Sequence, residues 1–385
     1  MSMSSYKDTL NLPKTEFPMK ANLPVRENDF LKFWEDSQIY KKLREKSKGK
    51  NPFILHDGPP FANGHIHLGH VLNKTLKDIV VRYKSMQGYD VPYIPGWDCH
   101  GLPIEHQVAQ EMKDKSREAK DIRRRCAEYA EKFIEIQKQE FIRLGVWGDW
   151  DHPYVTMTPV YEAEILRVFA SLVEKDMVYE GLRPVYWSTG CYTALAEAEV
   201  EYMDREDDSI YVKFSIPEEK NTSFVVWTTT PWTLPANLAL AVHPKMKYCS
   251  VKDGEETLIL AESRLPFIEK GLNKTLEVTQ GGISGKDLEG KDYQHPFIGR
   301  MGKVYPAEFV TEESGSGIVH IAPGHGHDDY SLGQEHSLEI LSPVDDEGKL
   351  TEECGVKSLV GKYVFDANQD VIQILKKSGK LIYQE

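Results

Sequence analysis

Residues 53–94 constrain the fold more than any other part of this 385-residue sequence. Three apolar residues, 53–55, predict a short buried strand, and the Gly and Pro residues of positions 58–64 end it in an irregular loop. A helix with apolar residues at a 3.6-residue period is predicted from about His67 to Met86, and a second strand is predicted over residues 91–94. Strand, loop, helix and strand in this order are typical of a parallel α/β sheet.

The loop before this helix resembles a phosphate-binding turn in its composition and place. Free backbone N–H groups and the positive end of the helix dipole attract anions there, although the loop is neither GxGxxG nor GxxxxGK[ST]. His67 and His70 lie in the first helical turn, where imidazoles can donate to phosphate oxygens that gain charge in a transition state. Gly69 between them leaves room for a flat ring against the backbone. A structural role, or half of a metal site, is the alternative for this histidine pair.

The rest of the chain divides into a helical part and a β-rich part. Helices are predicted over residues 28–46 and 119–144, and Arg123, Arg124 and Arg125 of the second form either a solvated face or an RNA-facing patch. From about residue 185, short β-prone runs predict a barrel or sandwich-like domain. These runs are residues 209–216, 224–229, 238–242, 247–252 and 258–261, and one more helix is predicted over residues 367–377.

Composition excludes several classes of protein. Lys and Arg number 47 against 60 Asp and Glu, and a net charge of −13 argues against a general nucleic-acid-binding surface. Five scattered cysteines without a CxxC pair fit a reducing cytoplasm better than a disulfide scaffold. Residues 1–20 lack the apolar core of a signal peptide, and no apolar run is long enough to span a membrane.

Two polar runs in the β-rich part form a second candidate site. Thr228, Thr229 and Thr230 end a β run, where they reflect either strand propensity or a row of hydroxyls that line a polar pocket. Residues 320–330 hold three histidines and two aspartates within a short stretch, which suggests a metal hydrolase. No HExxH or comparable ligand pair supports that alternative, so we expect no metal site.

At this point the sequence resembles a known family, the class I aminoacyl-tRNA synthetases. Residues 67–70, His-Leu-Gly-His, form a HIGH-type signature. Residues 56–64 (HDGPPFANG), 73–74, 76–78 and 95–105 (PGWDCHGLPIE) are similar to the isoleucyl version in particular, and the similarity covers essentially the whole chain. The resemblance implies the first half of a Rossmann-like nucleotide-binding domain with an inserted β-rich, barrel-like editing domain.

The resemblance also implies roles for individual residues of the first part. His67 and His70, with Gly69, would bind ATP and stabilise its phosphates, with Mg²⁺, while the adenylate forms. Gly58, Pro59, Trp97 and Asp98 would line the pocket for the amino acid and its adenylate, and Asp98 would hold the α-ammonium. Independently of the family, a carboxylate in the turn after a strand lies where open α/β sheets bind ligands, although a turn-capping Asp is the simpler alternative.

The two polar runs resemble the two walls of the editing pocket in isoleucyl-, valyl- and leucyl-tRNA synthetases. Residue by residue, the implied editing site is Thr228, Thr229, Thr230, Asn237, His320 and Asp329, with Asp329 binding the α-ammonium of the mischarged amino acid. Discrimination of isoleucine from valine by isoleucyl-tRNA synthetases is the established example of why a second site is needed. One methylene gives a pocket only about 1–3 kcal/mol of discrimination.

The predicted domains are an N-terminal arm and helix (1–47), the first half of the catalytic domain (48–185) and the editing domain (186–385). We expect the N-terminal portion of a cytoplasmic, monomeric isoleucyl-tRNA synthetase that uses isoleucine, ATP and tRNA. The chain holds no KMSKS-like run, so it should not complete aminoacylation alone. Ser188 replaces the first cysteine of a WCxxC zinc half-site and leaves Cys191 alone, so no zinc is expected. A free-standing editing hydrolase, and a metal hydrolase using His320, His325, His327 and Asp328, are the alternatives.

Overall fold

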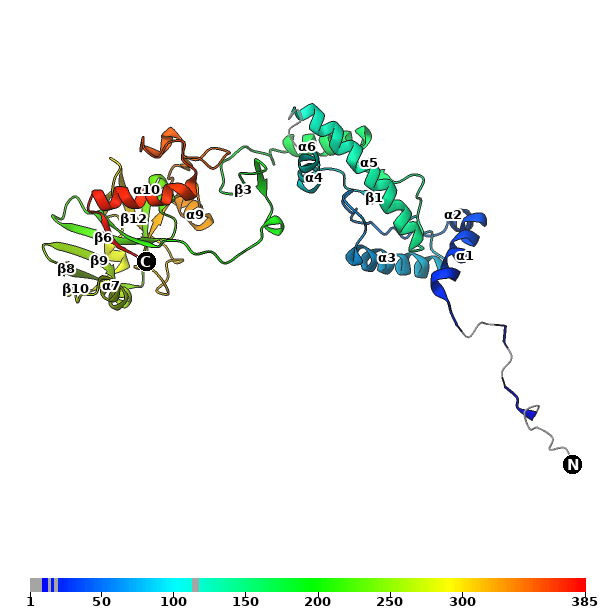
Figure 1. The fold of residues 1–385 in the computed structure, drawn as a ribbon, viewed down its shortest axis with the longest axis horizontal. Helices are drawn as coiled ribbons and strands as arrows, with labels where there is room; N and C mark the ends of the chain where they lie inside the picture. The colour runs from blue at the N-terminus through cyan, green and yellow to red at the C-terminus, as the bar shows by residue number, and fades with distance from the viewer. Residues whose placement is uncertain (1–8, 13–14, 17–19, 113–117) are drawn as a thin grey trace. The chain divides into compact units, whose positions relative to one another are not determined.

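The computed structural model describes residues 9–12, 15–16, 20–112 and 118–385, so part of the predicted N-terminal arm lies outside it. The chain forms two compact units, Met1–Tyr179 and Glu180–Glu385 (Figure 1). Each unit has its own clusters of buried apolar side chains. No helix in the described part of the chain is long and apolar enough to cross a membrane.

The first unit is mainly helical. Its elements are α1 (Leu23–Asp36), α2 (Ile39–Ser47), α3 (Leu68–Met86), β1 (Gly96–Trp97), α4 (Leu102–Met112), α5 (Ala119–Arg143), β2 (Tyr154–Val155) and α6 (Pro159–Val173). The predicted helices at α3 and α5 are confirmed. The single helix predicted over residues 28–46 is wrong, because Gln38 adopts a left-handed φ of 49° and separates α1 from α2.

The parallel strand pairings in this unit each involve few residues. β1 pairs with β2 in parallel, and two isolated parallel bridges join Pro52 to Asp90 and Phe61 to Asp98. The strands predicted over residues 53–55 and 91–94 are not formed. Proline has no N–H to donate to a ladder, and the second of these segments contains Pro92 and is followed directly by Pro95.

The apolar stripe predicted for α3 also behaves differently from the expectation. Leu72, Leu76 and Ile79 are exposed, whereas Lys74 and Val81 are buried. The 3.6-residue period therefore predicted the helix correctly but did not predict which face of it is buried. The face that is buried lies against the 53–66 segment and carries a charged residue inward.

The second unit is built on a closed barrel. Its strands are β3 (Tyr186–Ser188), β4 (Thr193–Leu195), β5 (Ile210–Ser215), β6 (Thr222–Thr228), β7 (Ala239–Val242), β8 (Lys247–Asp253), β9 (Glu256–Ala261), β10 (Glu277–Ser284), β11 (Asp292–Gln294), β12 (Met301–Pro306), β13 (Ile318–Ile321) and β14 (Leu381–Gln384). Six of them close a ring in the order β5-β6-β13-β7-β12-β11, with β11 pairing back to β5. The predicted fold class, a parallel α/β unit with a barrel-like β-rich unit, is confirmed.

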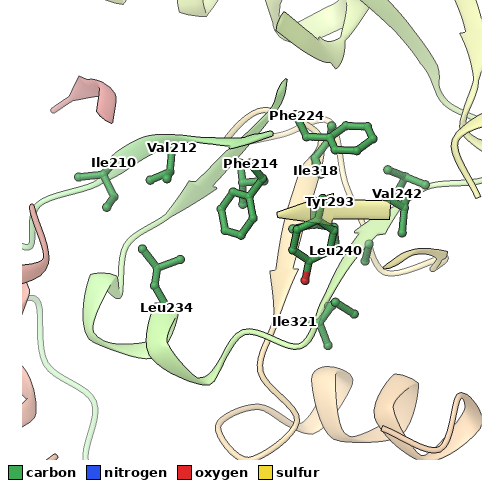
Figure 2. Close-up of a cluster of buried hydrophobic side chains, with 14 of the residues drawn as sticks. Ile210, Val212, Phe214, Phe224, Leu234, Leu240, Val242, Tyr293, Ile318 and Ile321 are labelled. Atoms are coloured by element: carbon green, nitrogen blue, oxygen red, sulfur yellow. The ribbon is translucent and has the colours of Figure 1, made fainter. Parts of the chain in front are cut away.

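Helices cover this barrel. They are α7 (Leu265–Leu272), α8 (Gly285–Leu288), α9 (His327–Glu335) and α10 (Val364–Lys377), with 3₁₀ turns η2 (Glu197–Glu199), η3 (Pro231–Ala236), η4 (Glu262–Arg264) and η5 (Glu352–Cys354). Apolar side chains of β5, β6, β7 and β13 fill the interior with Leu234 of η3 and Tyr293 of β11 (Figure 2). In Figure 1, α10 and α7 lie on opposite sides of strands β6 and β9. Because Leu234 is buried in this interior, the turn η3 is part of the core.

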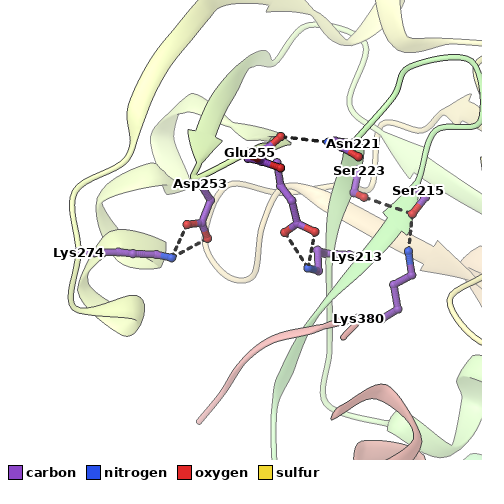
Figure 3. Close-up of polar contacts among 9 residues, drawn as sticks. Lys213, Ser215, Asn221, Ser223, Asp253, Glu255, Lys274 and Lys380 are labelled. Atoms are coloured by element: carbon purple, nitrogen blue, oxygen red, sulfur yellow. Dashed lines mark hydrogen bonds and ion pairs between the residues drawn. The ribbon is translucent and has the colours of Figure 1, made fainter. Parts of the chain in front are cut away.

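The rim of the barrel carries polar contacts (Figure 3). Lys213 pairs with Glu256, Lys274 pairs with Asp253, and Lys380 donates to Ser215. Solvent-exposed ion pairs each contribute less than about 1 kcal/mol. The buried apolar interior, and not these pairs, therefore accounts for most of the stability of the unit.

Candidate functional site

The two histidines of the HIGH-type signature cap helix α3. The His67 Nδ1 accepts from the Gly69 N–H at 3.1 Å, and the His67 N–H donates to His70 Nδ1 at 3.3 Å. Their rings stack with centroids 3.9 Å apart. A Cβ at position 69 would lie 2.8 Å from the His67 ring, so a larger residue there would displace that ring. Burial, together with the charges of His67 and Lys74, lowers the pKa of His70.

One face of α5 holds the loop that leads into this helix. The buried Gln137 donates to the carbonyls of Phe61 (3.0 Å) and Gly64 (2.9 Å). One turn further along, Glu140 accepts from the Ile66 N–H at 3.0 Å and lies 2.5 Å from His65 Nδ1. The loop is thus fixed on both sides of Gly64, which orients the first turn of α3.

A buried ion network below the loop was not predicted from the sequence. Asp57, whose side chain is fully buried, pairs with Lys74 and Lys77 of α3 and accepts from the Tyr93 hydroxyl at 2.6 Å. Burial by itself raises the pKa of Asp57, but the hydrogen bonds from Lys74, Lys77 and Tyr93 hold that pKa below its usual value. The available signal was an aspartate directly after an apolar run, with two lysines at i and i+3 on the following helix.

The predicted amino-acid pocket residues take different positions. Gly58 is exposed with open space beside it, and Pro59 is half-buried. The backbone of Asp98 pairs with this loop, since its N–H donates to Pro60 O (2.9 Å) and its carbonyl accepts from the Ala62 N–H (2.8 Å). The Trp97 side chain is 1% exposed and donates to Gln137, so it lies in the core behind the loop. The structure thus places the Asp98 backbone against residues 60–62, directly after Gly58 and Pro59, and places the Trp97 ring elsewhere.

In the second unit, residues 227–237, here called the threonine peptide, form a chain of hydroxyl contacts. Thr228 Oγ1 accepts from the Thr230 N–H at 3.0 Å and lies 3.3 Å from Thr230 Oγ1. Thr230 Oγ1 in turn lies 3.3 Å from Thr233 Oγ1. Thr229 and Thr230 are exposed, whereas Thr228 and Thr233 are buried. The hydroxyl chain therefore runs from the surface into the unit.

His320 ends this chain. The Thr233 hydroxyl donates to Thr230 O (2.8 Å) and lies 3.1 Å from His320 Nε2. His320 Nδ1 is buried with no hydrogen-bond partner in the described part of the chain. Sequence reasoning had chosen His320 but not Thr233, which joins it to the threonines.

Asp329 lies in the first turn of α9, directly after the loop that follows His320. Its Oδ1 accepts from the Ala322 N–H at 2.7 Å, and a Cβ at Gly326 would lie 2.5 Å from its Oδ2. Burial, reinforced by the neighbouring Asp328, raises the pKa of this carboxyl although backbone N–H groups donate to it. Among the described residues, no lysine or arginine pairs with it. Asp329 is thus a half-buried carboxylate at which a cation would be stabilised.

Asn237 lies away from the hydroxyl chain. Its side-chain amide donates to Ala239 O (2.8 Å), its side-chain oxygen accepts from the Tyr293 hydroxyl (2.6 Å), and the residue is 1% exposed. Asn237 therefore supports the peptide from inside the barrel, and the structure does not bring it to the surface with Thr229 and Thr230.

A cavity of about 440 Å³ lies beside the peptide at Trp232 and His325.

The alternative of a metal centre has no counterpart in the described residues, in which no group of three His, Cys, Asp or Glu side chains could hold an ion. In the β3–β4 hairpin, the Cys191 N–H donates to Ser188 Oγ at 3.2 Å. The serine that replaces a zinc-type cysteine therefore closes the turn of this hairpin.

The buried histidines predict a pH dependence of stability for the second unit. Burial lowers the pKa of both His320 and His325 to about 4. Because an unfolded histidine titrates near 6.5, the unfolded chain binds more protons between these values. The stability that the neutral, buried histidines contribute is therefore complete above about pH 6.5 and is lost as the pH falls through about 4.

We expect this unit to be less stable at pH 5 than at pH 7.5 by about 2 kcal/mol per histidine. Urea unfolding followed by circular dichroism at the two pH values measures the difference. The variant His325→Gln should lose less stability than the parent between them. An equal loss in both proteins would contradict the assignment.

The chain is similar to known proteins over nearly its whole length. A family model described as tRNA synthetases class I (I, L, M and V) matches residues 29–366. An isoleucine–tRNA ligase of Sulfurihydrogenibium sp. (strain YO3AOP1) is 53% identical over 387 residues, which are 99% of this chain and 41% of that protein. Those of Methylacidiphilum infernorum (isolate V4) and Thermotoga maritima (strain MSB8) are 54% and 53% identical over 98% of this chain, and 42% and 41% of their own lengths.

This chain thus spans about two fifths of the length of these curated relatives. The family match covers both units, including the HIGH-type signature, the threonine peptide and Asp329. The chain therefore belongs to the class I tRNA synthetases, the family of the isoleucine, leucine, methionine and valine enzymes.

Proposed function

We propose that this chain serves the ATP-dependent attachment of isoleucine to its tRNA through isoleucyl-adenylate, and the hydrolytic editing of mischarged valyl-tRNA. Its partners are then isoleucine, ATP with Mg²⁺, and the isoleucine-accepting tRNA. The identity of over 50% to isoleucine–tRNA ligases supports isoleucine as the amino acid. Cytoplasmic action as a monomer, and the domain limits 1–47, 48–185 and 186–385, belong to the same proposal.

In the first unit, we assign ATP binding to the N-terminus of α3. His67 and His70 stand where backbone N–H groups and the helix dipole favour phosphate, with Gly69 between them. Gly58 and Pro59 form the edge of the adenylate pocket. The Asp98 side chain, which makes no hydrogen bond or ion pair within the described residues, receives the α-ammonium of isoleucine. Trp97 acts indirectly, because its ring supports the loop from the core.

In the second unit, we assign editing to the threonine peptide, His320 and Asp329. The observation that carries this assignment is the half-buried Asp329 carboxylate, which has no cationic partner among the described side chains. An aminoacyl ester brings one full positive charge, its α-ammonium, close to the bond that is cut. The exposed Thr229 and Thr230 supply hydroxyls for the ester and the attacking water, and Thr228 and His320 hold them in place.

The test is hydrolysis of valyl-tRNA and of isoleucyl-tRNA by the purified chain. Valyl-tRNA should be deacylated well above the spontaneous rate, whereas isoleucyl-tRNA should be spared, because the second pocket must refuse the larger side chain. Given isoleucine, ATP with Mg²⁺ and tRNA, the same preparation should form no isoleucyl-tRNA.

The other outcomes separate the alternatives. Deacylation abolished by a chelator would favour the metal hydrolase. Sustained synthesis of isoleucyl-tRNA would contradict the expectation that the chain is incomplete for charging. Equal hydrolysis of both aminoacyl-tRNAs would refute selective editing.

A further inference from the structure

Residues 293–300 contact the threonine peptide through backbone carbonyls and the Asn237 side chain. Two of them, His295 and Arg300, here called the anchoring pair, bind three carbonyls at the end of η3, those of residues 234, 235 and 237. Arg300 Nη1 donates to Pro235 O and to Asn237 O, each at 2.9 Å. His295 Nε2 lies 2.8 Å from Leu234 O. None of the assignments above uses either residue.

The tautomer of His295 is fixed by its own turn. Its Nδ1 accepts from the N–H groups of Phe297 (3.3 Å) and Ile298 (3.1 Å), so the ring hydrogen lies on Nε2 and is donated to Leu234 O. The ring is 3% exposed. It is therefore a fixed neutral donor and not a group that exchanges protons with solvent.

The turn η3 needs such donors. Pro231 and Pro235 lack N–H groups, so side-chain donors add to the few backbone hydrogen bonds of η3, such as that from the Asn237 N–H to Leu234 O at 2.9 Å. Thr233 and Leu234 are adjacent: Thr233 contacts His320 through its hydroxyl, and Leu234 contacts His295 through its carbonyl. A shift of η3 away from the anchoring pair would therefore move Thr233 away from His320.

We propose that His295 and Arg300 are positioning residues of the editing reaction, which hold the threonine peptide in register with His320. This inference rests on the editing function proposed above. Neither residue contacts the exposed threonines or Asp329, so the pair acts on the rate of hydrolysis and not on the affinity for tRNA.

The variant that tests this is Arg300→Met in the full 385-residue chain, with Arg300→Lys as the conservative variant. Lys303→Met is the matched control, since Lys303 is an exposed cation of the neighbouring strand that pairs with Asp292 at 2.8 Å. Two readouts are taken: kcat and KM for valyl-tRNA deacylation, and amide hydrogen exchange of residues 228–238 and of strands β8 and β9. The exchange readout does not depend on activity.

For Arg300→Met we expect kcat to fall about 10- to 100-fold with KM within about threefold, because two hydrogen bonds are lost. Exchange in residues 228–238 should accelerate at least about tenfold while β8 and β9 remain protected. Arg300→Lys should recover part of both, and Lys303→Met should change neither. Unchanged kcat, or equally accelerated exchange in β8 and β9, would overturn the proposal. An inactive parent chain would instead refute the editing function itself.

Discussion

Asp329→Asn is expected to slow deacylation of valyl-tRNA by this chain by about 30- to 1000-fold. Loss of one partner of a buried, hydrogen-bonded charge pair costs about 2–5 kcal/mol, and each 1.4 kcal/mol is about tenfold in rate. The asparagine oxygen can still accept from the Ala322 N–H, so the free energy of unfolding should change by less than about 1 kcal/mol. Initial rates of deacylation and urea unfolding of the same preparation measure both quantities.

Asp329→Ala should differ from this variant. The carboxylate accepts a backbone hydrogen bond from Ala322 that alanine cannot replace, so Asp329→Ala should also destabilise the unit. Asp328→Asn is the matched control, because its side chain is exposed on the same helical turn. If Asp329→Asn stays within about threefold of the parent rate, Asp329 does not bind the ammonium.

Asp57→Ala is expected to destabilise the first unit by about 3–5 kcal/mol, the typical effect of breaking a buried ion pair. The variant leaves Lys74, which is 3% exposed, without its carboxylate. Two buried cysteines allow each unit to be followed separately: Cys99 in the first and Cys249 in the second. Thiol labelling against urea concentration should show earlier exposure of Cys99 and no change at Cys249.

Glu164→Ala provides the control for this prediction. Glu164 forms an exposed pair with Arg167 within α6, so its removal should shift Cys99 labelling by less than about 1 kcal/mol. Equal shifts for Asp57→Ala and Glu164→Ala would show that the Asp57 network does not stabilise the unit.

Periodicity predicted the parts of the fold that depend on local pattern. Helices α3 and α5 and strands β5 to β9 lie where apolar spacing placed them. The segments 53–55 and 91–94 did not form strands, although their apolar character indicated burial; in the second, Pro92 has no N–H for a ladder. Ring closure between β11 and β5 depends on residues about 80 positions apart, which no local pattern contains.

The candidate sites also contain some features that the sequence predicted and others that depend on distant segments. The place of His67 and His70 in the first turn of a helix follows from the apolar period of residues 67–86, whereas their mutual capping contacts were not predicted. The burial of Trp97 and Asn237 does not follow from a local pattern, because Gln137 and Tyr293, which bond to them, come from distant segments. Arg300 and Asp57 were missed for the same reason: their importance arises from the backbone and the charges that the fold brings to them.

The central claim is that the threonine peptide and Asp329 together bind a mischarged aminoacyl ester. A crystal structure of this chain with an amide-linked, non-hydrolysable valyl-adenosine tests it most directly. The account predicts the valyl ammonium within hydrogen-bonding distance of Asp329, with the acyl group beside Thr229 and Thr230. An analogue bound with its ammonium away from Asp329, for example wholly within the cavity lined by Trp187 and Phe365, would contradict it.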